Sequence, residues 1–155
     1  MKPWPAGMQR RHCVVAGLGS VAGFSRVRAA AAAMQAPDLR AAIAAFTAGA
    51  SVREGRVEID VAALVENGNA VPITVSVASP MSAVDHVVTI ALFNERNPQR
   101  DIARFTLGPH AGRARVSTRI RLATSQQLVG VTRLSDGSYW SHAVDVVVTL
   151  AACIE

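Results

Sequence analysis

Arg or Ser alternates with Ala, Val, Thr, Ile or Leu throughout the stretch Arg113-Ala114-Arg115-Val116-Ser117-Thr118-Arg119-Ile120-Arg121-Leu122. Because successive side chains of a β-strand point to opposite faces, this period of two predicts a strand whose inner face carries Val116, Thr118, Ile120 and Leu122. The opposite face carries Arg115, Arg119 and Arg121. That face is either solvated or meets a partner, and a solvated face is the more common of the two.

The same period recurs along most of the chain after residue 50. Six further strands are predicted, at residues 57–61, 72–77, 87–93, 102–107, 128–134 and 139–150. Ser135-Asp136-Gly137-Ser138 predicts a tight hairpin between the last two strands. About seven short strands at this spacing predict an all-β fold, an antiparallel β-sandwich of immunoglobulin type, with a barrel as the weaker alternative.

A short helix is predicted before the first strand. Asp38 can cap it, Leu39, Ile43 and Phe46 share one face, and Gly49 ends it. We therefore divide the chain into residues 1–36, a helix and connector at 37–50, a sandwich at 51–150 and a C-terminal arm at 151–155.

Residues 1–36 resemble an export signal. The first 12 residues are basic, the run CVVAGLGSVAGF from Cys13 to Phe24 is modestly apolar, and Ala29 to Ala33 offers small-residue cleavage sites. Twelve apolar residues are too few for a permanent membrane anchor, which needs about 20. Arg10-Arg11 before this run favours the twin-arginine route to the periplasm, with an ordinary Sec signal as the alternative. Met8 is a second candidate start.

The net charge of +5 belongs to the N-terminal segment alone. Lys2, Arg10, Arg11, Arg26 and Arg28 lie in that segment, and the other 11 basic residues balance 11 carboxylates. A neutral domain lacks the basic surface that nucleic-acid binding requires, so no nucleic-acid partner is expected.

After removal of the signal, one cysteine remains, Cys153, two residues from the end of the sequence. In an oxidising compartment an unpaired thiol is normally avoided or used. No internal disulfide can form, which leaves intermolecular pairing, covalent chemistry or an incidental terminal cysteine.

Two other kinds of functional site, a blue-copper centre and a cysteine hydrolase, are disfavoured. Blue copper needs His, Cys, His and a weak axial ligand such as Met, but nothing except Ile154 and Glu155 follows Cys153, and His86, His110 and His142 have no ligand-like spacing. A cysteine hydrolase needs a base and an oxyanion site on a rigid scaffold, which a terminal tail does not supply. We therefore expect no metal, no cofactor and no catalytic residue.

From about Asp38 to Cys153 the chain resembles SoxY, the sulfur-carrying subunit of the bacterial thiosulfate-oxidising Sox system. The resemblance rests on several segments in the same order: residues 66–77 (ENGNAVPITVSV), Ser79-Pro80-Met81, Phe93 through Asn97-Pro98, residues 112–122 and Ser135-Asp136-Gly137-Ser138.

The resemblance implies an immunoglobulin-like subunit that pairs with a second small β-sandwich subunit, SoxZ. It implies a carrier and not an enzyme: a C-terminal cysteine holds sulfur intermediates covalently, and by position this residue is Cys153. A c-type cytochrome complex would join thiosulfate to the thiol, a hydrolase would release sulfate, and a sulfane dehydrogenase would oxidise the remaining sulfur. By position, Ala151, Ala152, Ile154 and Glu155 form the carrier arm.

The arm departs from the family pattern. The family ends Gly-Gly-Cys-Gly-Gly, whereas this chain ends Ala151-Ala152-Cys153-Ile154-Glu155. The length of five residues is kept, roughly 17 Å when extended, but Ala and β-branched Ile are stiffer than Gly. Glu155 and the terminal carboxylate should raise the pKa of the thiol above its free value of about 8.5 and weaken it as a nucleophile.

Two alternatives to the carrier function stay open. One is a diverged Sox-type sandwich that keeps a SoxZ-like partner interface but has lost or altered the carrier chemistry. The other is a generic exported binding module, for which Cys153 would have no role and no stable partner is expected.

Overall fold

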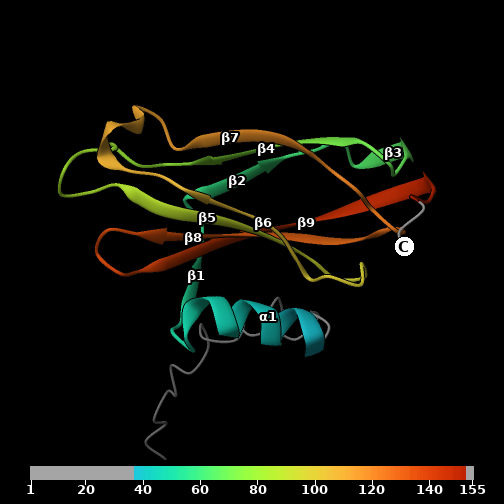
Figure 1. Cartoon of the computed structure of the whole chain (residues 1–155), viewed down its shortest axis with the longest axis horizontal. Helices are drawn as coiled ribbons and strands as arrows, with labels where there is room; N and C mark the ends of the chain where they lie inside the picture. The colour runs from blue at the N-terminus through green and yellow to red at the C-terminus, as the bar shows by residue number, and fades with distance from the viewer. Residues whose placement is uncertain (1–36, 153–155) are drawn as a thin grey trace, which may run out of the picture. The chain divides into compact units, whose positions relative to one another are not determined.

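Two β-sheets face each other in the part of the chain that the computed structural model describes, residues 37–152 (Figure 1). One sheet has the order β1-β9-β8-β5-β6, with β3 also paired to β9, and the other has the order β2-β4-β7. The strands of the first sheet are β1 (Val52–Glu54), β3 (Leu64–Asn67), β5 (Val87–Asn94), β6 (Asp101–Thr106), β8 (Gln126–Leu134) and β9 (Tyr139–Leu150). Those of the second are β2 (Val57–Asp60), β4 (Val71–Val77) and β7 (Arg115–Ile120). The predicted β-sandwich is confirmed.

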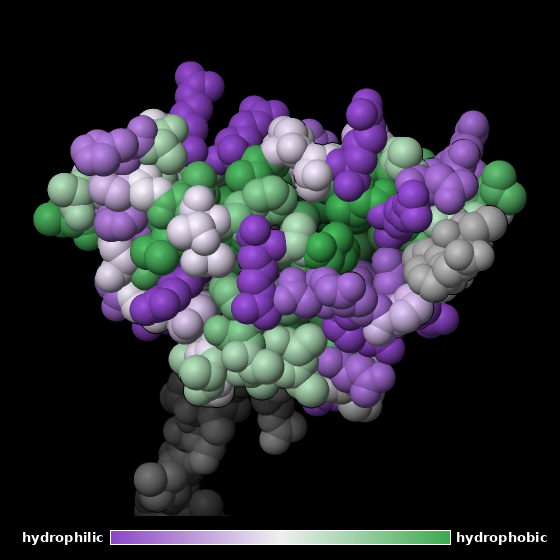
Figure 2. All heavy atoms as spheres, viewed as in Figure 1, coloured by the Kyte–Doolittle hydropathy of each residue, from purple (hydrophilic) through white to green (hydrophobic). Residues whose placement is uncertain are grey.

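The core between the sheets is built from aliphatic side chains that alternate along the strands. Val71, Ile73, Val75 and Val77 of β4 are buried, with Pro72 exposed and Thr74 and Ser76 half-buried between them. Ile90 and Leu92 of β5 and Leu128 of β8 face them from the other sheet. The outer face of β2, β4 and β7 is hydrophilic, and Figure 2 shows hydrophilic side chains projecting along this upper edge of the molecule.

Two strands that the sequence did not predict, β1 and β3, make the sandwich differ from a purely antiparallel one. Both pair parallel to β9, with Val52 opposite Tyr139 and Leu64 opposite Val147. β3 lies between the first two predicted strands, in a stretch for which the sequence predicts no strand. Ahead of the predicted first strand, Gly55 and Arg56 adopt positive φ values of 110° and 56° and redirect the chain from β1 in one sheet to β2 in the other.

Helix α1 (Pro37–Thr47) packs on the face of the first sheet that points away from the core (Figure 1). Leu39 is fully buried, and Ile43 and Phe46 pack beside it against strand residues that include Phe93 and Val131. Asp38 lies inside the first turn of the helix, so its predicted role as the residue before the helix is wrong. The Asp38 carboxylate instead lies 3.2 Å from Nη2 of Arg100. Gly49 ends the helix as predicted, with φ of 79°.

Strand β2 lies close to β8 and β9 because a glycine and a histidine face it. A Cβ on Gly130 would lie 3.3–3.4 Å from the side chains of Ile59 and Val57, so the missing side chain allows the close approach. His142, the register partner of Gly130, accepts a hydrogen bond from the Ile59 N–H at its Nδ1, at 3.2 Å. This bond satisfies a backbone donor that the β2–β4 ladder leaves free.

No helix within the described residues is long and apolar enough to cross a membrane.

Candidate functional site

The root of the predicted carrier arm is held by backbone hydrogen bonds up to the residue before Cys153. β9 ends at Leu150, whose carbonyl accepts a hydrogen bond from the Gly68 N–H at 2.8 Å. Ala151 is exposed, but the Ala152 N–H donates to the carbonyl of Leu122 at 3.1 Å, and Ala152 is only 8% exposed. The chain is therefore anchored through Ala152.

Gly68 lies at the junction of the three segments that form this root. Its N–H donates to Leu150 and its carbonyl accepts from the Leu122 N–H at 2.9 Å. A Cβ on Gly68 would lie 2.3 Å from the carbonyl oxygen of Leu122 and 3.0 Å from the nitrogen of Ala152. A contact at 2.3 Å is far inside van der Waals distance, so only glycine fits without a shift of the backbone.

A buried polar network fixes the segment around Leu122 from the other side. Asn97 donates from Nδ2 to the carbonyl of Arg121 at 2.8 Å, and its Oδ1 accepts from the Ala123 N–H at 3.0 Å. Nε2 of Gln126 donates to the same Oδ1 at 2.7 Å. Asn97 and Gln126 are 8% and 5% exposed, and buried hydrogen bonds of this kind hold a loop in one conformation. The anchor for Ala152 is therefore itself well fixed.

Of the predicted arm residues, the structure describes only Ala151 and Ala152. Cys153, Ile154 and Glu155 lie outside the described residues, as do Arg10 and Arg11 of the predicted export signal. The assignment of residues 151–155 to a carrier arm stays a prediction, as does the role of Cys153. The sequence does not predict Gly68, Leu122 or Asn97 as site residues. All three lie in segments that carry the resemblance to SoxY, but no pattern in the sequence indicates that they meet.

The three histidines of the described chain have no shared site. His86 lies in the loop before β5 and not in a strand, with its Nδ1 3.1 Å from the carbonyl oxygen of Ser82. His110 lies in the short 3-10 helix η1 (Pro109–Ala111), and His142 bonds Ile59 in the core. Between residues 37 and 152, no three His, Cys, Asp or Glu side chains come close enough together to hold a metal ion.

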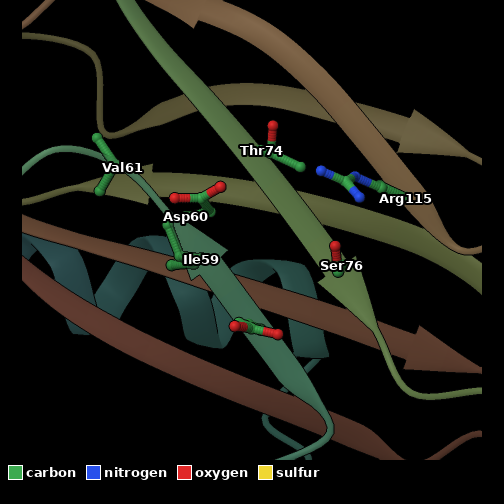
Figure 3. Close-up of a pocket in the computed structure, with 7 residues that line it drawn as sticks. Ile59, Asp60, Val61, Thr74, Ser76 and Arg115 are labelled. Atoms are coloured by element: carbon green, nitrogen blue, oxygen red, sulfur yellow. The ribbon is translucent and has the colours of Figure 1, made fainter.

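A shallow hollow of about 250 Å³ lies on the outer face of β2, β4 and β7 (Figure 3). Arg115 reaches toward Thr74 and Ser76 from one side, and Glu58 and Asp60 of β2 line the other. Seven residues of extended chain, about 23 Å, separate Arg115 from Leu122, where Ala152 is anchored. The residue directly after Ala152 cannot bridge that distance, so this hollow is not a site for a group carried on Cys153.

Comparison with known proteins identifies the family to which the chain is similar. The model of a family described as sulfur oxidation protein SoxY matches residues 43–153. Among solved structures, the chain is similar to the sulfur carrier protein SoxY from Chlorobium limicola f thiosulfatophilum, with 30% sequence identity and a TM-score of 0.61. That match covers 72% of this chain and 96% of the other. No curated protein sequence matches the chain significantly.

Superoxide reductases share the fold at lower identity. The superoxide reductase (neelaredoxin) from Ignicoccus hospitalis is 19% identical, with a TM-score of 0.54 over 61% of this chain and 80% of that one. The enzyme from Nanoarchaeum equitans is 14% identical, with a TM-score of 0.53 over 62% and 100%. At these identities the likeness concerns the fold alone. The family match, in contrast, covers most of the sandwich and ends at Cys153, and the chain belongs to the SoxY family of sulfur oxidation proteins.

Proposed function

We propose that this chain is a periplasmic carrier that holds thiosulfate-derived sulfur covalently on Cys153 and presents it to oxidising and hydrolysing enzymes. The observation that carries the proposal is the extent of the family match, which runs from residue 43 and includes Cys153 as its last residue. A sulfur carrier role in sulfur oxidation follows from the family, and Cys153 is the one thiol of the chain after the predicted signal.

The anchored root supports this role because it limits how far the Cys153 thiol can lie from the sandwich. A carrier must present its cargo outside its own fold, and the anchored Ala152 lies two residues after Leu150, the exposed last residue of β9. Neighbouring Cα atoms lie 3.8 Å apart, so the Cys153 sulfur lies within about 7 Å of the Ala152 Cα while the anchor holds. The thiol is thus attached close to a rigid domain, where an enzyme can approach it.

The loading step is an oxidation. A thiolate at Cys153 and the outer sulfur of thiosulfate form a sulfur–sulfur bond, and two electrons pass to a c-type cytochrome complex. Hydrolysis of the terminal sulfone group by a second enzyme then releases sulfate and leaves the outer sulfur on the cysteine, where a sulfane dehydrogenase can oxidise it. This chain contributes the thiol, and its partners supply the catalysis.

The remaining parts of the proposal rest on the sequence and the family. Arg10 and Arg11 would direct export of the folded protein to the periplasm by the twin-arginine route, and a SoxZ-like subunit would form a heterodimer with the sandwich. The second candidate function, a Sox-type subunit with altered carrier chemistry, is favoured by one observation. The arm has alanines in place of the family's glycines, and Ala152 is bonded to the domain.

Reconstitution with the thiosulfate-joining cytochrome complex tests the proposal. We expect cytochrome reduction by thiosulfate to require this protein and to be lost entirely in Cys153→Ser. A Val84→Ser variant serves as the control, because Val84 is an exposed residue beside the β8–β9 hairpin and its substitution should leave the reaction unchanged. Equal reduction with Cys153→Ser and with the natural protein would rule out the carrier role and favour the second candidate.

A further inference from the structure

Arg121 is a cation without a partner beside the root of the predicted carrier arm. It directly precedes Leu122, whose carbonyl accepts the Ala152 N–H at 3.1 Å, and the segment after β7 runs past the end of β9 (Figure 1). Leu122 is fully buried and Arg121 is exposed, so the Arg121 side chain points away from the core. Within residues 37–152 its guanidinium has no hydrogen bond, ion pair or aromatic contact. Its charge is therefore available to another group.

No carboxylate within the described chain pairs with Arg121. On the same outer face, Asp60 of β2 is level with Ser117 of β7, which lies four residues, about 13 Å, from Arg121 along the strand. Glu66 lies on the outer face of the other sheet, because its neighbour in β3 is buried in the core. Glu95 is engaged by a backbone N–H and by the arginine that follows it. The positive charge of Arg121 is therefore not neutralised locally.

Arg121 is close enough to reach a group carried on Cys153 while the anchor holds. Across the 3.1 Å hydrogen bond the Leu122 Cα lies within about 7 Å of the Ala152 Cα, so the Arg121 Cα lies within about 11 Å of it. An extended arginine side chain spans about 6 Å from Cα to Cζ, and the Cys153 sulfur lies within about 7 Å of the Ala152 Cα. Together these two lengths exceed the separation, so contact does not require the release of Ala152. Arg115 is about 23 Å from Leu122 along the strand and lies outside this reach.

The cargo of the proposed carrier is an anion that such a cation can bind. Thiosulfate is a dianion, and once its outer sulfur is bonded to Cys153 a sulfonate group remains at the end of the carried group. Glu155, two residues after the thiol, adds a negative charge that repels both the incoming anion and the bound sulfonate. A guanidinium presents N–H donors in one plane and binds oxyanions through charge-assisted hydrogen bonds. Arg121 is thus suited to offset the repulsion that the arm itself creates.

We propose that Arg121 attracts the incoming sulfur oxyanion and then binds the sulfonate of the group carried on Cys153; this rests on the proposed carrier function. The guanidinium donates hydrogen bonds to the sulfonate oxygens and holds the carried group beside the end of β9. After hydrolysis has released the sulfonate as sulfate, the remaining sulfane sulfur has no such oxygens. Arg121 therefore stabilises the thiosulfate-loaded state of the carrier and not the sulfane state that follows it.

Chemical loading with tetrathionate tests the role of Arg121 without any partner enzyme. The thiolate attacks an inner sulfur of the tetrathionate dianion, one sulfur–sulfur bond breaks and another forms, and thiosulfate leaves with the electron pair. The product is the same cysteine-bound thiosulfate that the carrier is proposed to hold. Iodoacetamide, which is neutral, reacts with the same thiolate, and both rates are measured from the mass of the peptide that contains Cys153. The ratio of the tetrathionate rate to the iodoacetamide rate cancels any change in the fraction of thiolate.

Loss of the guanidinium should lower this ratio selectively. Arg121→Gln should reduce it roughly three-fold or more at low salt, and the reduction should shrink at high salt. Arg121→Lys keeps the charge and should keep most of the ratio. Arg115→Gln is the matched control, because it removes the same charge from the same outer face but from beyond the reach of the arm, and it should change the ratio less than about two-fold.

The outcomes separate this role from the carrier function itself. A ratio in Arg121→Gln equal to that in Arg115→Gln, or a loss in Arg121→Lys as large as in Arg121→Gln, would overturn the role of Arg121. If cytochrome reduction by thiosulfate still required Cys153 in that case, the carrier function would stand and only the role of Arg121 would fail. If cytochrome reduction did not require Cys153, the carrier function would fail, and the role of Arg121 with it.

Discussion

Gly68 is the residue on which the geometry of the arm root depends most directly. Its backbone bonds both Leu150 and Leu122, and the space that a Cβ would need is taken by the Leu122 carbonyl and the Ala152 nitrogen. No positive φ is involved, so the requirement for glycine comes from space alone. A side chain at position 68 would therefore disturb the hydrogen bonds that anchor Ala152 as well as the local turn.

Gly68→Ala should therefore both destabilise the domain and loosen the arm. We expect a loss of about 1–3 kcal/mol in the free energy of unfolding, measured with urea, because the new methyl group forces a backbone shift in a packed region. The Ala152 amide should also exchange its hydrogen faster. Gly108→Ala is the control, since a Cβ there meets nothing within 4 Å. Unchanged stability and exchange in Gly68→Ala would contradict the close contact.

Asp136, in the hairpin between β8 and β9, makes the stability of the fold depend on pH. Hydrogen bonds from the Ser138 side chain and from the Ser138 N–H, the latter at 2.8 Å, lower the pKa of Asp136, and Arg56 and Arg53 nearby add to this. A lowered pKa in the folded state stabilises the fold above the unfolded pKa of about 3.9. That stabilisation disappears as the pH falls through the lower folded value.

Urea unfolding at a series of pH values below about 5 should show this effect. The natural protein should lose stability more steeply on acidification than Asp136→Asn, whose amide keeps the turn bond but does not titrate. Because Asp136 is exposed, the difference will be small and should shrink at high salt. Identical slopes in the two proteins would rule out the contribution of Asp136.

Helix α1 is the element that closes the outer face of the larger sheet. Leu39 is fully buried against it, and the Phe46 ring lies 5.8 Å from the rings of both Phe93 and Tyr139. Arg104 of β6 lies over Phe46 at 5.2 Å from the ring centre. The helix is thus a packed part of the domain, although it stands before the first strand.

Leu39→Ala measures how firmly the helix is docked. Removal of a fully buried leucine side chain should cost about 2–5 kcal/mol in the free energy of unfolding. Val84→Ala, at an exposed position, should change it by less than about 0.5 kcal/mol. If Leu39→Ala unfolded at the same urea concentration as the natural protein, the helix would not be part of the cooperative unit.

The elements that the sequence predicted and those it did not differ in a physical way. β4, β7 and β9 are long enough for a period of two to show, and each buries one face. β1 and β3 have only three and four residues, and their pairing is parallel to β9, so residues distant in the sequence define them. Their own side chains carry too little alternation for a prediction.

The same distinction holds for the functional site of the whole molecule. Cys153 can be proposed as the carrier residue from the sequence because a single thiol and the family pattern around it suffice for that proposal, and its role stays a prediction. The anchor could not be predicted, because the bonds among Gly68, Leu122 and Ala152 join three segments that only the folded chain brings together.

The molecule as a whole is a β-sandwich that anchors its predicted carrier arm through Ala152, the residue before Cys153. The direct test is the mass of the peptide that contains Cys153, in protein taken from cells growing on thiosulfate. We predict a mass gain that corresponds to bound thiosulfate or sulfane sulfur and that a reductant removes. An unmodified thiol on that peptide throughout growth would contradict the carrier function.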